Sequence, residues 1–186
     1  MTTEQKAKDV LCPLVPSLPS RALSAWDHWW TRQAPPHAMA LLRIAFGCHM
    51  LLFWGLRFPA VPLLYGNKGL AIPYDDWLPS SLTFLLAPPP APVASVLAAL
   101  MIAALCTFTI GAATRTSACV ALLLSLYYSL LSFQDFGPTY NRLFLMLFAA
   151  FAISPAGKAF SFTMWRTHGS IFAWEPGSIL AHRLVA

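Results

Sequence analysis

Four long apolar stretches separated by short polar segments dominate the pattern along the chain. They cover residues 37–56, 92–113, 116–133 and 140–154. A helix that crosses a membrane needs about 20 mostly apolar residues. The first three stretches meet this length, whereas the fourth is short unless it begins outside the hydrocarbon core. The pattern therefore predicts an all-α, polytopic membrane protein with four transmembrane helices and additional interfacial segments.

The second and third stretches are separated only by the residues around Thr114 and Arg115, so they should form a tight antiparallel hairpin. Ser95, Ala99 and Ala103 recur every four residues on the second stretch. Small residues at this spacing allow a neighbouring helix to approach closely. We expect this stripe to be the packing face of the second helix.

Composition supports the membrane assignment and removes other classes. Of the 186 residues, 58% are hydrophobic and 10% are charged, against about 25% charged in soluble domains. This excludes a disordered chain, a disulfide scaffold and an ordinary cytosolic enzyme. The net charge is +5, but the basic residues punctuate apolar stretches instead of forming the dense patch that nucleic acid requires. The expected partner is the lipid bilayer, and no nucleic acid.

The four cysteines are far apart and lack the spacing of metal ligands. They are Cys12, Cys48, Cys106 and Cys119. Three of them lie within apolar stretches, so free buried thiols are expected. We predict no metal site.

The distribution of basic residues predicts the orientation. With the N-terminus inside, eight Lys and Arg residues lie on the cytoplasmic side and two, Arg57 and Lys68, lie in outer loops. This is a strong positive-inside bias. We expect residues 1–36 and 156–186 to be cytoplasmic or interfacial, the transmembrane domain to cover 37–155, and the location to be a bacterial inner membrane. Residues 1–36 contain no uninterrupted apolar core and do not resemble a secretory signal.

The outer connection, residues 58–91, contains seven prolines and several apolar residues. Proline interrupts a continuous helix, so this connection is predicted to be a re-entrant or interfacial segment. Tryptophan favours the headgroup zone of a bilayer. The predicted interfacial anchors are Trp26, Trp29, Trp30, Trp77, Trp165 and Trp174.

Arg43 lies within the first stretch, where a charged residue is a functional candidate by default. Near the end of a span, however, an arginine can extend its side chain to the headgroups or join a buried polar network. We favour the network, because a planar guanidinium suits several acceptors at once. His49 lies near the middle of the same span on another face. A hydrogen bond to a neighbouring helix is expected for it rather than a metal.

Residues 134–142 form the densest polar segment beside an apolar helix. Asp135 and Arg142 can pair there, and Asn141 can bond across to Tyr127 or Tyr128 of the third span. A structural lock between helices is the favoured interpretation. The same place is also the best candidate for a small polar ligand.

Four local sequence motifs follow one another along the chain. A Trp-rich segment at 26–30 precedes Arg-Ile-x-x-Gly at 43–47. Leu-Tyr-Gly-Asn-Lys-Gly-Leu follows at 64–70, and Tyr-Asn-Arg at 140–142 leads to Ser-Pro at 154–155. Over about residues 24–183 the chain resembles the amino-terminal half of the horizontally transferred transmembrane domain family, which includes the vitamin K-dependent γ-carboxylases.

The resemblance implies that the helices carrying the family's catalytic lysine are absent here. None of the four predicted spans contains a lysine, so a strong base for carboxylation is missing. The first hypothesis is a non-catalytic subunit or accessory component of a larger membrane complex, or of a homo-oligomer. The alternative is a quinone- or lipid-dependent carboxylase-like enzyme completed by another chain, with Arg43, His49 and Asn141 around one cavity. A channel or transporter is weaker, because no inverted repeat is apparent. We expect no cofactor beyond lipid or quinone contact.

Overall fold

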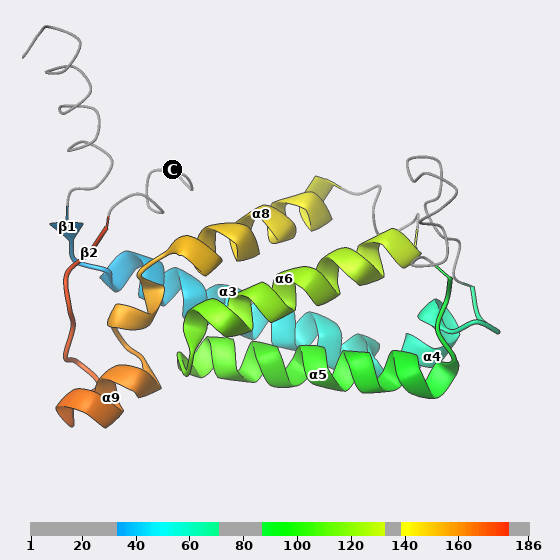
Figure 1. Ribbon diagram of the computed structural model, residues 1–186, viewed down its shortest axis with the longest axis horizontal. Coiled ribbons are helices and arrows are strands. Elements are labelled where there is room, and N and C mark those ends of the chain that lie inside the picture. Colours follow the sequence, from blue (N-terminus) through cyan, green and yellow to red (C-terminus); the bar gives the residue numbers. More distant parts are fainter. Residues whose placement is uncertain (1–32, 71–86, 133–138, 179–186) are drawn as a thin grey trace, which may run out of the picture.

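The computed structural model describes residues 33–70, 87–132 and 139–178. Four main helices pass up and down along a common direction (Figure 1). They are α3 (His37–Arg57), α5 (Ala91–Ile110), α6 (Thr114–Leu131) and α8 (Thr139–Ile153). Shorter elements are η1 (Phe58–Ala60), α4 (Val61–Tyr65), η3 (Ala156–Lys158), α9 (Phe162–His168), β1 (Gln33–Ala34) and β2 (Gly177–Ser178).

Within the described ranges, three helical segments are long and apolar enough to cross a membrane. They are His37–Tyr65, Ala91–Ile110 and Thr114–Leu131. Helix α8 is apolar but has only 15 residues, which gives a length of about 22 Å against a hydrocarbon core of about 30 Å. The helical class and the three long segments agree with the sequence pattern.

The first helical segment extends further than predicted. The sequence placed the end of the span at Leu56 and a proline-rich connection after it, whereas helical backbone continues through η1 and α4 to Tyr65. Pro59 and Pro62 occupy the first positions of these two short helices. A proline there loses no hydrogen bond, because the first N–H groups of a helix have no intrahelical acceptor. Trp77 and the apolar residues around it lie outside the described ranges.

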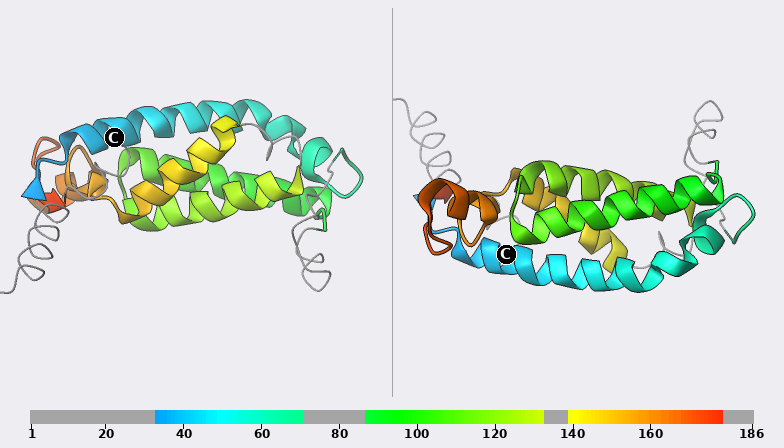
Figure 2. Two further views of the ribbon diagram at one scale, coloured as in Figure 1. Left: turned by 90° about the horizontal axis from the view of Figure 1, so that it is seen from above. Right: turned by 90° about the horizontal axis from the view of Figure 1, so that it is seen from below.

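The helices pack in chain order, with α3 on α5, α5 on α6 and α6 on α8. Figure 2 shows α8 running obliquely from α6 towards α3, where aromatic rings complete the contact. The Phe46 ring lies 4.9 Å from that of Phe148, and the Phe108 ring lies 5.2 Å from that of Phe151. This aromatic cluster joins α3, α5 and α8 in the core.

Close approach of α3 and α5 depends on Gly47. A methyl group at Gly47 would overlap the hydroxyl of Thr109 on α5. Thr109 in turn donates to the carbonyl of Leu105 at 2.7 Å, which satisfies its hydroxyl within α5. The absence of a side chain at Gly47 therefore allows Thr109 to lie directly against the backbone of α3.

The predicted packing stripe on α5 is wrong for contacts within the chain. Ala99 and Ala103 are exposed and Ser95 is half-buried, whereas Ala94 and Ala98 are fully buried. The true stripe lies one residue earlier, a rotation of about 100° around the helix. Helix α5 is apolar on all sides, so the hydrophobic pattern alone did not define its inner face.

The cysteines also differ from expectation. Cys48, Cys106 and Cys119 are free, as predicted, but they are exposed on the helix surfaces instead of buried between helices. Cys12 lies outside the described ranges. A thiol behaves as a small hydrophobic group, so an apolar stretch of sequence does not distinguish an inward from an outward position.

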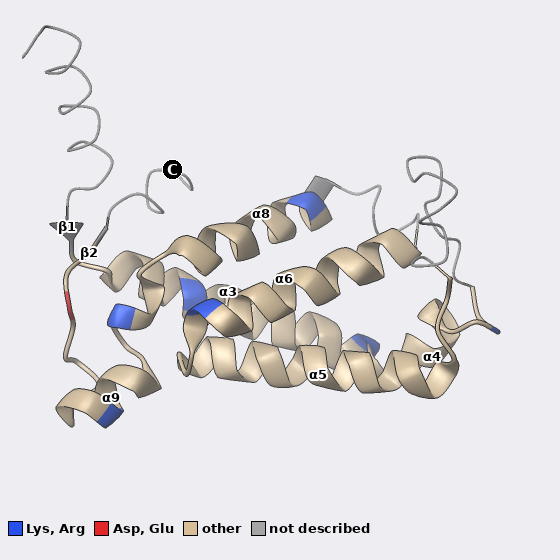
Figure 3. Cartoon of the chain, viewed as in Figure 1, with Lys and Arg blue, Asp and Glu red and all other residues tan. Residues whose placement is uncertain are grey.

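The two ends of the described part meet. Gln33 pairs with Ser178 and Ala34 with Gly177 in a short antiparallel ladder, which lies at the same end of the bundle as α9 and the α5–α6 turn (Figure 1). Figure 3 shows that Lys and Arg residues lie mainly towards the two ends of the bundle. In the described ranges Glu175 is the single acidic residue.

Candidate functional site

A buried guanidinium is the main polar feature at the end of the bundle that contains the α5–α6 turn. Arg43 is completely buried. Its Nη1 donates to the carbonyl oxygen of Ala156 at 2.7 Å, and its Nη2 donates to that of Phe160 at 2.6 Å. These carbonyls belong to the segment that follows α8, so the guanidinium links α3 to that segment. Arg43 therefore belongs to a buried network and does not extend to the surface.

The surrounding turns are shaped to admit this side chain. Gly111 has a φ of 83°, and an added Cβ there would lie 2.8 Å from Arg43 Nη1. Its carbonyl accepts a hydrogen bond from the Thr163 hydroxyl at 3.0 Å. Ser161 donates to the carbonyl of Gly157 at 2.6 Å and accepts from the Met164 N–H, capping α9. Arg43 thus bonds α3 to residues 156–160, and Thr163 bonds the α5–α6 turn to α9.

The network around Arg43 contains no carboxylate. The one acidic side chain of the described ranges, Glu175, lies 3.7 Å from Lys158 Nζ and 3.4 Å from His168 Nε2. Backbone carbonyl oxygens are strong hydrogen-bond acceptors, and hydrogen bonds from a charged donor to them are stronger than neutral ones. The two carbonyls take the place of a counter-ion for Arg43, which is an arrangement suited to fixing structure.

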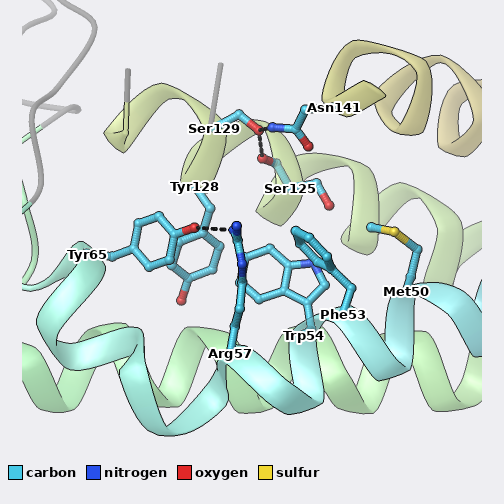
Figure 4. A pocket seen from close by; sticks show the side chains of 9 residues that line it. All are labelled: Met50, Phe53, Trp54, Arg57, Tyr65, Ser125, Tyr128, Ser129 and Asn141. Carbon is cyan, nitrogen blue, oxygen red and sulfur yellow. Dashed lines mark hydrogen bonds between the residues drawn. The ribbon is translucent and has the colours of Figure 1, made fainter. Parts of the chain in front are cut away.

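A small aromatic cavity lies near the opposite end of the bundle (Figure 4). The rings of Trp54, Tyr65 and Tyr128 form its main wall, with centroids 4.9 Å apart for Trp54 and Tyr128 and 4.7 Å for Tyr65 and Tyr128. The Tyr128 hydroxyl donates to the Ala94 carbonyl at 2.7 Å. The guanidinium of Arg57 lies 4.3 Å from the centre of the Phe53 ring and 3.4 Å from the Tyr65 hydroxyl.

The remaining wall of this cavity is polar. Asn141 Nδ2 donates to the Ser129 hydroxyl at 2.8 Å, and Ser129 donates to the Ser125 carbonyl at 2.7 Å (Figure 4). The Trp54 indole N–H and the Ser125 hydroxyl are buried without a hydrogen-bond partner. The volume of the cavity, measured as the space in which the centre of a water molecule can move, is about 10 Å³. This is the room that about one water needs. This cavity suits a bridging water, and it is too small for a quinone ring.

The structure separates the residues that the sequence singled out. His49 is exposed on α3, with its ring 5.5 Å from that of Phe144 on α8. Asn141 does bond across to the third span, but to Ser129 instead of a tyrosine. Arg142 is exposed on α8. Asp135, and with it the predicted pairing to Arg142, lies outside the described ranges.

Two of the six predicted tryptophan anchors lie in the described ranges, and four lie outside them. Trp165 on α9 and Trp174 after it are about half exposed, and Trp174 packs 5.4 Å from the His37 ring at the start of α3. Both lie at the end of the bundle, as an anchor requires. Trp26, Trp29, Trp30 and Trp77 lie outside the described ranges.

Sequence reasoning missed the aromatic cavity. Tyr65 belonged to a predicted loop and Trp54 looked like an ordinary apolar position, whereas Tyr128 was considered only as a possible partner of Asn141. One available signal was the pair Ser125 and Ser129, whose spacing places two hydroxyls on one face of an apolar helix. The other partners come from α3 and α8, and their convergence required the tertiary structure.

Comparison with protein-family models, with curated proteins and with solved structures finds no match for this chain. The family resemblance of the local motifs therefore stays a prediction. The function has to be argued from the geometry of the helices and their side chains.

Proposed function

We propose that the chain is an integral membrane protein with four membrane passes that acts as a non-catalytic subunit, binding another transmembrane helix through the outward face of α3. The observation that carries this proposal is the character of that face. Its exposed residues are spaced by three, four, three, four and three positions: Ala38, Leu41, Ala45, Cys48, Leu52 and Gly55. This is the heptad spacing of helix pairs, and four of the six residues are small.

Gly55 is the most informative member of this face. An added Cβ at Gly55 would meet no atom within 4 Å, so packing within the chain does not require a glycine there. Glycine within a helix destabilises it by about 0.5–1 kcal/mol relative to alanine. A close contact with a helix outside the chain gives this glycine a physical role, because small residues let two backbones approach in a membrane.

His49 lies beside this face, near the middle of α3, and is exposed. A polar side chain facing lipid at that depth is unfavourable, and such residues usually face a helix bundle or a polar cavity. A hydrogen bond from the imidazole to a partner helix contributes about 0.6–2 kcal/mol in membranes. His49 therefore supports the same face as a contact surface.

The proposed topology has α8 as the fourth, shorter pass and both termini in the cytoplasm of a bacterial inner membrane. The β1–β2 pairing supports an even number of passes, because it joins the two ends of the described part at one end of the bundle. The positive-inside bias supports the assignment of that end to the cytoplasm.

The carboxylase-like alternative needs Arg43, His49 and Asn141 around one cavity. The cavity beside Asn141 is lined by neither Arg43 nor His49 and has room for about one water. A helix-binding subunit is therefore the function that the geometry favours.

The test is to fill the contact face with a bulky residue. Gly55→Leu should abolish co-purification of the partner, or of a second copy, in mild detergent, as measured by native mass spectrometry. The matched control is Ala99→Leu on the exposed face of α5, which should keep the complex. The isolated Gly55→Leu chain should unfold at or above the wild-type temperature, since the site is open. A wild-type chain that is strictly monomeric and free of partners, or an intact Gly55→Leu complex, would refute the proposal.

A further inference from the structure

A groove at the end of the bundle assigned to the cytoplasm has no role in the proposed subunit function. It lies between the first turn of α6 and the segment that follows α8, and its volume is about 360 Å³. Thr114, Arg115 and Thr116 line one side, and Ser154, Lys158 and Thr163 line the other. Both walls include hydroxyl and basic groups, beside the apolar Ala113 and Pro155.

The first wall is the N-terminus of an 18-residue helix. The first N–H groups of an α-helix have no intrahelical acceptor, and they carry partial positive charge. Residue Ala113 at the N-cap makes no side-chain cap, and the first turn of α6 contains no acidic residue. An anion at this position would receive donors that the protein itself does not use.

A second and independent feature is the hydroxyl of Thr114. The residue is 6% exposed, and its Oγ1 is buried without a hydrogen-bond partner. This oxygen faces Gly157 across the floor of the groove, where an added Cβ on the glycine would lie 2.7 Å from it. A buried hydroxyl without a partner is unfavourable, whereas a bound oxyanion would accept its hydrogen.

The charges of the groove favour an anion as well. Arg115 is exposed at its rim. Lys158 lies on the opposite wall, where its Nζ donates to the Pro176 carbonyl at 3.1 Å and lies 3.7 Å from Glu175. Glu175 itself does not line the groove. Arg115 is therefore the cation best placed to recognise a ligand, with Lys158 adding longer-range attraction.

We propose that this groove binds a phosphate group, held by the α6 N-terminus, the Thr114 hydroxyl and the Arg115 guanidinium. The groove lies where the membrane-length helices α5 and α6 end, so the phosphodiester of an anionic lipid headgroup can reach it, as can free inorganic phosphate. Arginine suits either source, because its planar donors match phosphate oxygens in pairs. The proposal stands independently of the contact face on α3.

The experiment uses the full-length chain, delipidated in mild detergent. Native mass spectrometry measures binding of phosphatidylglycerol, with zwitterionic phosphatidylcholine as the reference lipid, and calorimetry measures inorganic phosphate. Arg115→Gln should weaken phosphate-group binding about tenfold, and Thr114→Val about threefold, with Thr114→Ser restoring it. The control is Arg166→Gln, an exposed arginine of α9 outside the groove, which should change binding by less than about twofold.

Each outcome is decisive when thermal unfolding shows that the variants fold. Preference for phosphatidylglycerol with no response to inorganic phosphate supports the site and assigns the lipid headgroup as its ligand. Binding of inorganic phosphate that depends on Arg115 supports the site with the free anion as ligand. Equal loss in Arg115→Gln and Arg166→Gln, or no selective binding of either probe, would overturn the proposal.

Discussion

At the end of the bundle that contains the α5–α6 turn, a charged side chain is completely buried among backbone carbonyls. Near the opposite end a water-sized cavity is lined by aromatic and neutral polar side chains together with the half-buried Arg57. The carbonyls of Ala156 and Phe160 bind the Arg43 guanidinium at 2.7 and 2.6 Å. At the other end, the Trp54 indole N–H and the Ser125 hydroxyl have no partner. Both terminal nitrogens of the buried cation are therefore bonded to carbonyls, although its Nε, like these neutral atoms, is buried without a partner.

The difference follows from the cost of burying each kind of group. An unpaired charge inside a protein is far more unfavourable than an unpaired hydroxyl or indole N–H. The arginine therefore has to meet strong acceptors, and the backbone carbonyls of the segment after α8 provide them. The neutral groups tolerate looser surroundings, and a single water can bridge them. The Arg43 network should consequently be the more sensitive of the two to substitution.

The largest effect is expected for Arg43. Arg43→Leu leaves two carbonyls without donors and should lower the free energy of unfolding by about 3 kcal/mol. Arg43→Lys should also lower the free energy of unfolding, by about 2 kcal/mol, because a single ammonium group cannot reproduce the planar pair of donors. Thermal unfolding of the purified chain in mild detergent measures both.

Arg57 supplies the matched control for this substitution, because it lies at the opposite end and is half-buried over the Phe53 ring. Arg57→Leu should cost only about 1 kcal/mol, the value of a partly exposed cation–π contact. An Arg43→Leu protein as stable as the wild type would show that the guanidinium does not organise the turns around it.

An intermediate effect is expected where the aromatic cavity depends on a hydrogen bond. Tyr128→Phe keeps the ring packing but removes the donor to the Ala94 carbonyl. The buried carbonyl then lacks this partner, so the free energy of unfolding should fall by about 1–2 kcal/mol. Tyr127→Phe on the neighbouring, half-buried residue is the control and should have little effect. Equal melting temperatures for both variants would contradict the assigned bond.

The smallest effects should distinguish two serines of one helix. Ser129→Ala removes the acceptor of Asn141 and a donor to the Ser125 carbonyl, which should cost about 1 kcal/mol. Ser125→Ala removes a hydroxyl that has no protein partner, so stability should stay within about 0.5 kcal/mol of the wild type. A larger loss in Ser125→Ala would show that a water held by this hydroxyl stabilises the cavity.

Several features were accessible from the sequence because they depend on local pattern. The long apolar stretches gave the three membrane-length helices, and the two-helix hairpin followed from the short connection around Thr114. The network favoured for Arg43 followed from its place in an apolar span and from the several donors of a planar guanidinium. The helical class and the approximate helix positions are therefore properties of the chain itself.

The faces and partners of the helices depended on tertiary structure. Helix α5 is apolar on all sides, so only packing selected Ala98 over Ala99 as the inward residue. The continuation of the first helical segment to Tyr65 depended on two prolines falling at helix starts, where no donor is lost. The acceptors of Arg43 lie more than 100 residues away, at separations of 113 and 117. Hydrophobic periodicity determines which residues become helix, but it contains no information on which distant carbonyl, ring or hydroxyl each side chain will meet.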